Sequence, residues 1–326
     1  MKTLLVHEAA FSRVQSRLEA IPGIETIVFA NDGAISRGGK PIEPSEVDPD
    51  LAWFSTDLYL CPARDQYIEL LRQAEALTWV HVSAAGLEHP IYPVLLARGV
   101  RLTTNHTHAP AISEYVLAAV LDHYQGGPQR RALQAAKTWQ VTRFREVAGT
   151  HWLIVGFGSI GQAVGKRARA FGATVTGIRR DLTPHPDADN LATLDDVHGH
   201  IAEADVVVLS VPLRGPTRDM VDAKFLAAMK PGSVLVNVGR GGLVDDDALL
   251  AALERGAPEH AVLDVFRQEP LQQESPYWAH PQVAMTSHCS GVTDMIVPRN
   301  DDVFLDNLDR VLTGRELLAE AKAQDV

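Results

Sequence analysis

One segment constrains the fold of this chain more than any other: the pattern Gly156-Phe157-Gly158-Ser159-Ile160-Gly161. It follows the apolar run Trp152–Val155 and opens a helical pattern over Ile160–Phe171. In such a unit the first glycine permits a tight turn, the second lets a pyrophosphate approach the backbone, and the third allows close helix–strand packing. The helix N-terminus adds unpaired N–H groups and a partial positive charge. The sequence therefore predicts a dinucleotide site that includes Gly156, Gly158, Ser159, Ile160 and Gly161.

Short β-branched runs alternate with helical stretches along most of the chain, which is typical of parallel βαβ units. A first series predicts strands at Lys2–Val6, Glu25–Phe29, Leu51–Phe54, Thr78–Val82 and Val100–Thr103. A second series predicts strands at Trp152–Val155, Thr174–Ile178, Val206–Val211, Val234–Val238, Ala261–Val265 and Val283–Thr286. The apolar spacing predicts helices at Ala63–Ala74, Ala109–Tyr124 and Val297–Leu312, the last ending at Thr313-Gly314. If that final helix returns to the first series, the chain crosses twice between two domains.

Composition narrows the class of protein. With 326 residues, 46% of them hydrophobic and 22% charged, the chain has the usual globular balance and the length of two domains. The net charge of −11, without a basic cluster, argues against nucleic-acid binding. The only cysteines, Cys61 and Cys289, lie too far apart in sequence to suggest a disulfide framework or a zinc site. No apolar run is long enough for a membrane span or a signal sequence, so we expect a cytoplasmic protein.

The end of the strand Thr174–Ile178 bears on the choice of cofactor. An NAD site carries an acidic residue at this position, which accepts a hydrogen bond from the ribose 2′-hydroxyl. Here Arg179 and Arg180 follow the strand instead. A guanidinium cannot accept that bond, but it pairs well with a 2′-phosphate. The sequence thus favours NADP, with NAD possible, although two solvated arginines in a loop would look the same.

Three further polar residues follow apolar strands: Arg240, Asp264 and His288, with Glu269 five residues after Asp264. Ligands of open α/β sheets bind at this carboxyl edge. Together these residues suit reduction of a 2-keto acid: Arg240 would bind the carboxylate and polarise the keto oxygen, and His288 would donate a proton. Glu269 would hold the other imidazole nitrogen and favour the charged ring. Each residue alone could be an ordinary surface residue, so the hypothesis depends on all of them following strands of one sheet.

These segments resemble the D-isomer-specific 2-hydroxyacid dehydrogenases, which include glyoxylate/hydroxypyruvate reductases, phosphoglycerate dehydrogenase and D-lactate dehydrogenases. The similarity runs from about Val82 to Leu312. The family's glycine fingerprint matches Gly156–Gly161, its N-x-[GAS]-R-G-x-x-V-[DN] signature matches Asn237–Asp245, its L-D-V-F-x-x-E-P-L segment matches Leu263–Leu271, and its T-x-H segment matches Thr286–His288. The resemblance covers most of the chain and involves several long motifs in the same order.

The resemblance implies a Rossmann-type doubly wound parallel sheet, residues 101–289, inserted into a smaller flavodoxin-like α/β substrate domain, residues 1–100 and 290–326. It implies that Arg240 binds substrate, that Glu269 partners the acid/base His288, and that the backbone around Ala84, Ala85 and Gly86 holds the substrate carboxylate. A homodimer is also implied. The cofactor site by this resemblance further includes Val211, Pro212, Thr217, Val238, Gly239, Asp264 and Ser290.

Some residues depart from the family pattern. Ser287 replaces the usual proline before the histidine, and Cys289 follows it, as either a reactive thiol or a small filler. His106 and His108 are unusual in their loop, but two histidines without a third ligand predict no metal site. The chain ends soon after the last predicted helix, so we expect no regulatory domain beyond it.

The leading hypothesis is an NADP-preferring reductase of a small 2-keto acid, with glyoxylate or hydroxypyruvate as first candidates. The loop Ser55–Cys61 has no lysine or arginine for a phosphorylated substrate, although Arg64 is near in sequence. A bulkier acid such as phenylpyruvate stays open, as does a phosphite or formate dehydrogenase of the same fold. A different class, a nucleotide-sensing binding protein similar to the family's corepressors, would bind cofactor without turnover.

Overall fold

The computed structural model describes residues 1–84, 86–87 and 89–322, and the chain divides into two compact units. Unit 1 comprises Met1–Thr107 and Asp294–Val326, and unit 2 comprises His108–Thr293. The chain therefore leaves unit 1 after Thr107 and returns to it at Asp294, so unit 1 is discontinuous in sequence. The boundaries expected from the sequence were 100/101 and 289/290, and the roles of the two units stay predictions.

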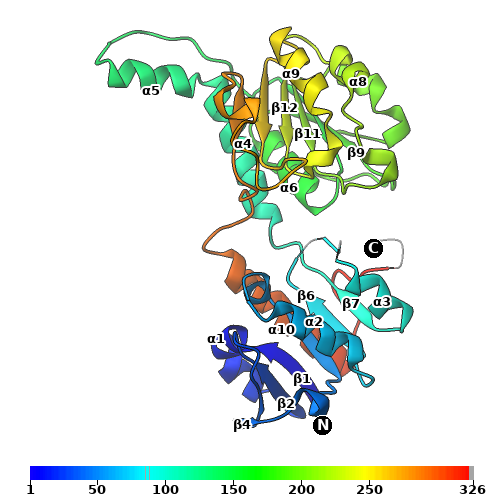
Figure 1. The fold of residues 1–326 in the computed structure, drawn as a ribbon. Helices are drawn as coiled ribbons and strands as arrows, with labels where there is room; N and C mark the ends of the chain where they lie inside the picture. The colour runs from blue at the N-terminus through cyan, green and yellow to red at the C-terminus, as the bar shows by residue number, and fades with distance from the viewer. Residues whose placement is uncertain (85, 88, 323–326) are drawn as a thin grey trace. The chain divides into compact units, whose positions relative to one another are not determined.

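Unit 1 is built on one twisted sheet with the strand order β4-β3-β2-β1-β5-β6-β7 (Figure 1). Strands β2, β1, β5, β6 and β7 pair in parallel, in the order of flavodoxin-like sheets, and β3 and β4 add an antiparallel edge. The strands are β1 (Lys2–His7), β2 (Ile24–Phe29), β3 (Ile35–Arg37), β4 (Lys40–Pro41), β5 (Leu51–Phe54), β6 (Trp79–Val82) and β7 (Arg101–Thr103). The helices are α1 (Glu8–Glu19), α2 (Arg64–Gln73), α3 (Ile91–Ala97) and α10 (Ile296–Thr313).

Helix α10 explains why the chain returns to unit 1. Its Phe304 is fully buried and stacks on Trp53 of β5, with ring centroids 3.8 Å apart. Leu305 and Leu308 extend the same apolar cluster against β1 and α1. The helix ends at Gly314, whose φ of +67° is a conformation that glycine adopts without strain. The expected final helix is therefore confirmed, and it closes one face of the sheet of unit 1.

Unit 2 contains a fully parallel sheet in the order β10-β9-β8-β11-β12-β13-β14, which is a Rossmann arrangement with one added strand. The strands are β8 (His151–Val155), β9 (Thr174–Ile178), β10 (Asn190–Ala192), β11 (Val206–Leu209), β12 (Val234–Asn237), β13 (His260–Leu263) and β14 (Val283–Met285). The helices are α4 (Ala109–Tyr124), α5 (Gly127–Ala135), α6 (Ser159–Ala170), α7 (His198–Ile201), α8 (Ala223–Ala228) and α9 (Asp246–Glu254). This architecture confirms the expected fold class.

Helices cover both faces of the unit 2 sheet, as the continuous apolar strands require. Helices α4 and α6 pack on one face with Trp152, Val175 and Val236, while α7, α8 and α9 pack on the other with Leu153 and Leu235. Helix α5 differs, because it projects away from the rest of this unit as an arm (Figure 1). Within the described residues, none of the helices is both long and apolar enough to span a bilayer.

Candidate active site

The glycine loop has the geometry that a bound dinucleotide needs. Gly156 follows β8 with a φ of +101°, and a Cβ there would lie 2.6 Å from the carbonyl carbon of Ser210. A Cβ on Gly161 would lie 2.3 Å from the Gly156 oxygen, so only glycine lets α6 start this close to β8. Gly158 has open space where its Cβ would be. The close contacts at Gly156 and Gly161 are with the protein's own backbone, whereas the loop is open at Gly158, where a pyrophosphate can approach.

The N-terminus of α6 can also bind an anion. Its N-cap is Gly158, and no side chain of the described residues caps it. By contrast, α8 and α9 begin at Asp222 and Asp245, whose carboxylates accept hydrogen bonds from Phe225 and Ala248 at 2.8 and 3.0 Å. The first N–H groups of α6 therefore keep their donor capacity for a phosphate. The residues present fit the dinucleotide that the sequence predicts.

The other predicted cofactor residues lie around this loop in unit 2. Thr217 is buried, and its hydroxyl donates to the Pro212 carbonyl at 2.8 Å, which shapes the segment after β11 that begins with Val211. Val238 and Gly239 are buried directly after β12. Arg179 follows β9 and donates to Asp181 at 3.2 Å, and Arg180 beside it is exposed. The roles of these residues in cofactor binding stay predictions.

The turn that carries Arg240 is fixed by its backbone. Asn237, at the end of β12, donates through Nδ2 to the Arg240 carbonyl at 3.0 Å and accepts from the Gly239 N–H at 3.1 Å. A Cβ on Gly241 would lie 1.9 Å from the carbonyl carbon of Phe266, so no other residue fits there. Sequence reasoning missed Asn237 as a functional position, although it stands first in the motif. The turn holds the Arg240 main chain in place whatever the side chain does.

The structure brings His288 and Glu269 together. His288 Nδ1 lies 2.7 Å from Oε2 of Glu269, while Oε1 of Glu269 accepts the Phe266 N–H at 2.9 Å. Both side chains are partly exposed, at 47% and 36%. A carboxylate anchored in this way requires a proton on Nδ1 of the imidazole and leaves Nε2 for a ligand. The pair can therefore present a single donor or acceptor nitrogen in a fixed orientation.

Asp264, which the sequence places in the cofactor site, lies directly after β13, and that role stays a prediction. It is 1% exposed, and its carboxylate accepts hydrogen bonds from Thr286 Oγ1 at 2.7 Å and from the Cys289 N–H at 2.9 Å. Ser290 adds its N–H at 3.1 Å and its hydroxyl. Asp264 thus organises the segment that carries His288, a role that the sequence motif alone did not reveal.

The remaining predicted residues divide between the two units. Ala84 and Gly86 lie in unit 1, where the Ala84 carbonyl accepts the Asn105 N–H at 3.3 Å, and Ala85 is outside the described residues. Cys289 is exposed and Cys61 is buried. A Cβ on Gly291 would meet Nδ1 of His108 at 2.9 Å, so this ring packs beside the His288 segment, and burial lowers its pKa. In the described part of the chain, no three His, Cys, Asp or Glu side chains are grouped as metal ligands.

Comparison with known proteins identifies the family. Residues 117–290 match the model of the D-isomer specific 2-hydroxyacid dehydrogenase NAD-binding domain, and the chain belongs to this family. It is 29% identical over 259 residues to a glyoxylate/hydroxypyruvate reductase B of Yersinia enterocolitica, covering 75% of this chain and 77% of that protein. A D-isomer specific 2-hydroxyacid dehydrogenase from Xanthobacter autotrophicus, solved with NADPH and MES, has a TM-score of 0.77, 26% identity and coverage of 99% and 98%.

The similarity extends to longer relatives. A D-3-phosphoglycerate dehydrogenase of Mycobacterium tuberculosis strain H37Rv is 35% identical over 233 residues, which cover 69% of this chain and 43% of that protein. The match therefore spans less than half the length of this relative. Family membership alone does not select one substrate among these enzymes.

Proposed function

We propose that this chain is an NADP-preferring oxidoreductase that interconverts a small 2-keto acid and the corresponding 2-hydroxy acid. The observation that carries the proposal is the 2.7 Å contact between His288 and Glu269, in the unit that also holds Arg240 and the glycine loop. These residues follow β8, β12, β13 and β14, whose carboxyl ends share one edge of a parallel sheet. The arrangement joins a proton donor, a carboxylate-binding cation and a nucleotide loop.

Each side chain has a separate part in keto-acid reduction. When bound, the nicotinamide supplies the hydride that reaches the carbonyl carbon. Arg240 binds the substrate carboxylate through its planar guanidinium and polarises the keto oxygen. His288 gives its Nε2 proton to the oxygen as negative charge develops there, while Glu269 keeps the proton on Nδ1 and stabilises the imidazolium. In the reverse direction, the same nitrogen accepts the proton of the hydroxyl group.

Arg179 supports NADP over NAD. Asp181, the carboxylate nearest in sequence, accepts the N–H and hydroxyl of Thr183 at 2.9 and 2.7 Å, and these bonds lower its pKa. Its second oxygen accepts from Arg179 at 3.2 Å. Asp181 is therefore occupied by its own turn rather than presented to a ribose. Because an exposed ion pair is weak, a 2′-phosphate can replace Asp181 as the partner of Arg179.

We expect Arg179→Asp to raise the KM for NADPH by about 10- to 150-fold, the equivalent of losing one charge-assisted bond of roughly 1.5–3 kcal/mol. The KM for NADH and the kcat with saturating cofactor should change little. Initial rates with both cofactors measure this. Arg72→Asp, the same charge change on α2 of unit 1, should alter neither KM. An equal loss with both cofactors in Arg179→Asp would place Arg179 outside the phosphate site.

A small, unphosphorylated substrate fits the loop of residues 55–61 best. Asp57 lies there, but Arg13 donates to both of its oxygens at 2.8 and 2.9 Å and Ser55 adds a third bond at 2.8 Å. Although burial opposes it, these partners hold the pKa of Asp57 below its usual range. The loop thus contributes neither a free acid nor a cation for a phosphate. Glyoxylate and hydroxypyruvate stay the first candidates, with phenylpyruvate as the bulkier alternative.

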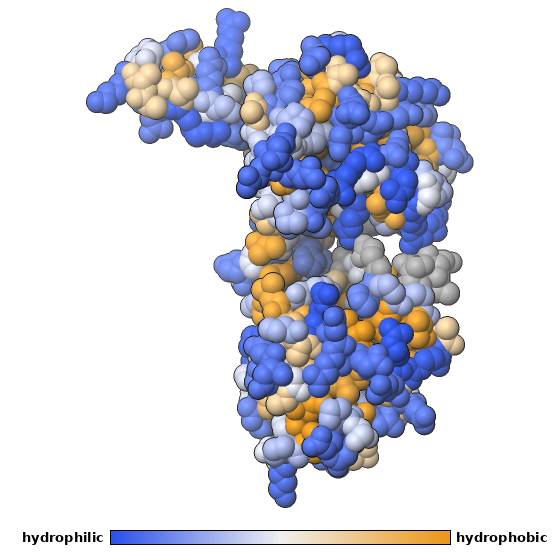
Figure 2. Space-filling view, in the orientation of Figure 1, coloured by the Kyte–Doolittle hydropathy of each residue, from blue (hydrophilic) through white to orange (hydrophobic). Residues whose placement is uncertain are grey.

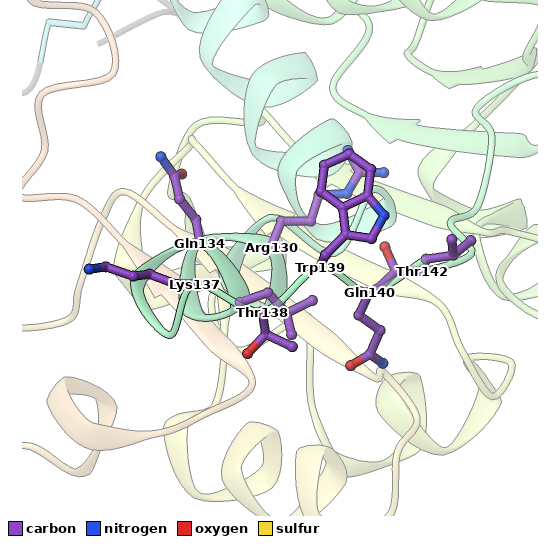
Figure 3. Close-up of a pocket in the computed structure, with 9 residues that line it drawn as sticks. Arg130, Gln134, Lys137, Thr138, Trp139, Gln140 and Thr142 are labelled. Atoms are coloured by element: carbon purple, nitrogen blue, oxygen red, sulfur yellow. The ribbon is translucent and has the colours of Figure 1, made fainter.

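The arm of unit 2, here taken as residues 126–146, which include α5 and the segment after it, supports a homodimer. Trp139 and Val141 are 99% and 90% exposed, and together with Arg130 they line a surface hollow (Figure 3). Hydrophobic and hydrophilic residues alternate over this arm (Figure 2). Residues 126–146 hold five basic residues and one acidic residue, in a chain whose net charge is −11. A basic arm with exposed apolar side chains fits a second copy of this chain, whose net charge is negative.

If the arm forms the dimer, Trp139→Asp should yield monomers at concentrations at which the unaltered protein is dimeric. Sedimentation velocity measures the change. Leu182→Ser, a truncation of a half-exposed leucine in another loop of the same unit, is the matched control and should stay dimeric. A Trp139→Asp protein that sediments as a dimer would remove the arm from the interface.

The proposed activity is tested by nicotinamide absorbance with NADPH or NADH against glyoxylate, hydroxypyruvate, pyruvate and phenylpyruvate. We expect turnover with NADPH on one of the small acids. Decay only with NADH would contradict the NADP preference. Tight NADPH binding without turnover of any acid would contradict the reductase proposal and favour a nucleotide-sensing role.

A further inference from the structure

The segment that carries His288 has an unusual backbone. His288 has a φ of +52°, in the left-handed region that residues other than glycine rarely adopt. Its N–H donates to the main-chain carbonyl of Asp264 at 2.7 Å. A conformation of this kind is strained for a residue with a side chain and persists only where the surroundings enforce it. The His288 side chain therefore depends on the contacts that hold residues 286–290.

Asp264 makes most of those contacts, and the Thr286 hydroxyl decides which group donates in the hydrogen bonds that lead to Asp264. The Asp264 carboxylate accepts from Cys289, Ser290 and the Thr286 hydroxyl. A hydroxyl has one proton. Because Thr286 donates that proton to Asp264, its oxygen can only accept a hydrogen bond from any other partner. That other partner is the Tyr115 hydroxyl, 2.8 Å away. The hydrogen bonds consequently run in one direction, from Tyr115 through Thr286 to Asp264.

Tyr115 is well placed to be the fixed end of this chain. It lies on α4, and its ring packs against the apolar cluster that contains Ile112, Val116 and Trp152. Burial raises the pKa of its phenol, so the proton stays on the oxygen. The residue is separated from Thr286 by 171 positions in sequence. Helix α4 thereby reaches the His288 segment through the Tyr115 hydroxyl group.

We propose that Tyr115 is a positioning residue for His288: its hydroxyl orients Thr286, which completes the donor set of Asp264 and keeps the His288 segment in its left-handed conformation. This inference rests on the proposed reductase function, in which His288 transfers the proton. Tyr115 touches neither Glu269 nor His288 through any hydrogen bond in the described structure, so it acts through Thr286 and Asp264.

The experiment compares Tyr115→Phe with Tyr124→Phe. Tyr124 lies on the same helix, and its buried hydroxyl has no partner among the described residues, so its loss is the matched control. We expect Tyr115→Phe to lower kcat for keto-acid reduction about tenfold with less than a twofold change in KM for cofactor and substrate. Tyr124→Phe should leave kcat and KM unchanged. Equal kcat values for both variants would overturn the proposal.

A double-mutant cycle separates positioning from general loss of structure. Thr286→Val removes the hydroxyl that links Tyr115 to Asp264, whereas Thr286→Ser keeps it. Tyr115→Phe should have no further effect on kcat in the Thr286→Val protein, but its full effect in the Thr286→Ser protein. Independent, additive effects of Tyr115→Phe and Thr286→Val would mean that Tyr115 does not act through Thr286.

A readout without turnover keeps this inference distinct from the proposed function. Amide hydrogen exchange should show faster exchange at Cys289 and Ser290 in Tyr115→Phe than in the unaltered protein, with the strands β8 and β12 unchanged. If no acid is turned over but this exchange increases, the reductase proposal fails and the positioning role of Tyr115 stands. Unchanged exchange at both amides would overturn that positioning role, whatever the activity.

Discussion

Replacing His288 with alanine should lower kcat for keto-acid reduction by about 10²–10⁴-fold, the usual contribution of a positioned general acid. The ring is partly exposed and fixed by Glu269 at 2.7 Å, so its removal takes away the proton donor without opening a buried cavity. In the proposed reduction, Nε2 of His288 is the donor to the keto oxygen, so the loss should appear in kcat rather than in cofactor binding. Stopped-flow and steady-state rates of both proteins measure the effect.

The control for this prediction is cofactor binding. His288→Ala should bind NADPH as tightly as the unaltered protein, because the glycine loop and Arg179 lie on other segments of unit 2. Glu269→Gln should fall between the two proteins in rate, since the amide still contacts the ring but lacks the negative charge that stabilises imidazolium. A His288→Ala protein with an unchanged rate would remove His288 from the proton transfer.

The second large effect is expected at Arg240. Losing two charge-assisted bonds to the substrate carboxylate, at roughly 1.5–3 kcal/mol each, should reduce kcat/KM for the keto acid by about 10²–10⁴-fold in Arg240→Ala. Asn237 and Gly239 fix the turn through the main chain, so we expect the variant to fold. Initial-rate kinetics measure the loss, and thermal unfolding checks the fold.

Arg240→Lys distinguishes the geometry of the site from its charge. Lysine keeps the positive charge but cannot form the planar two-pronged pair, so it should recover only part of the lost kcat/KM. Added guanidinium should partly restore the rate of Arg240→Ala and leave Arg240→Lys unchanged. Full activity in Arg240→Ala would show that the substrate carboxylate binds elsewhere.

Much of the fold could be predicted because buried parallel strands are continuous apolar runs. The strand at Leu51–Phe54 and the helix at Ala109–Tyr124 have the expected bounds. Strand β10 was missed, since Asn190–Ala192 is short and has no β-branched residue. The hairpin β3–β4 was missed because its strands are only three and two residues long. The strand expected at Val206–Val211 ends earlier, at Leu209, and the Ser210 hydroxyl that follows donates to the Gly156 carbonyl at 2.8 Å.

The candidate site could also be predicted only in part. Arg240, Glu269 and His288 could be placed on one sheet edge from sequence order alone, because each follows a recognisable strand. The role of Tyr115 could not, since the residue has the ordinary spacing of an apolar helix face and its partner Thr286 is distant in sequence. Likewise, nothing in the local sequence predicts the left-handed conformation of His288, which depends on Asp264 accepting bonds from several directions.

The split of the chain into two units has an evolutionary consequence. Residues 108–293 contain Glu269, His288, Arg240, the glycine loop and the Tyr115–Thr286–Asp264 hydrogen bonds, whereas residues 55–61 and 83–84 belong to the other unit. If those loops bind the substrate, as proposed, substitutions in them can change which acid is accepted without altering the hydrogen bonds of the His288 segment. Selection can then act on one unit at a time, and exchanging unit 1 for that of a relative should leave the Tyr115–Thr286–Asp264 hydrogen bonds intact.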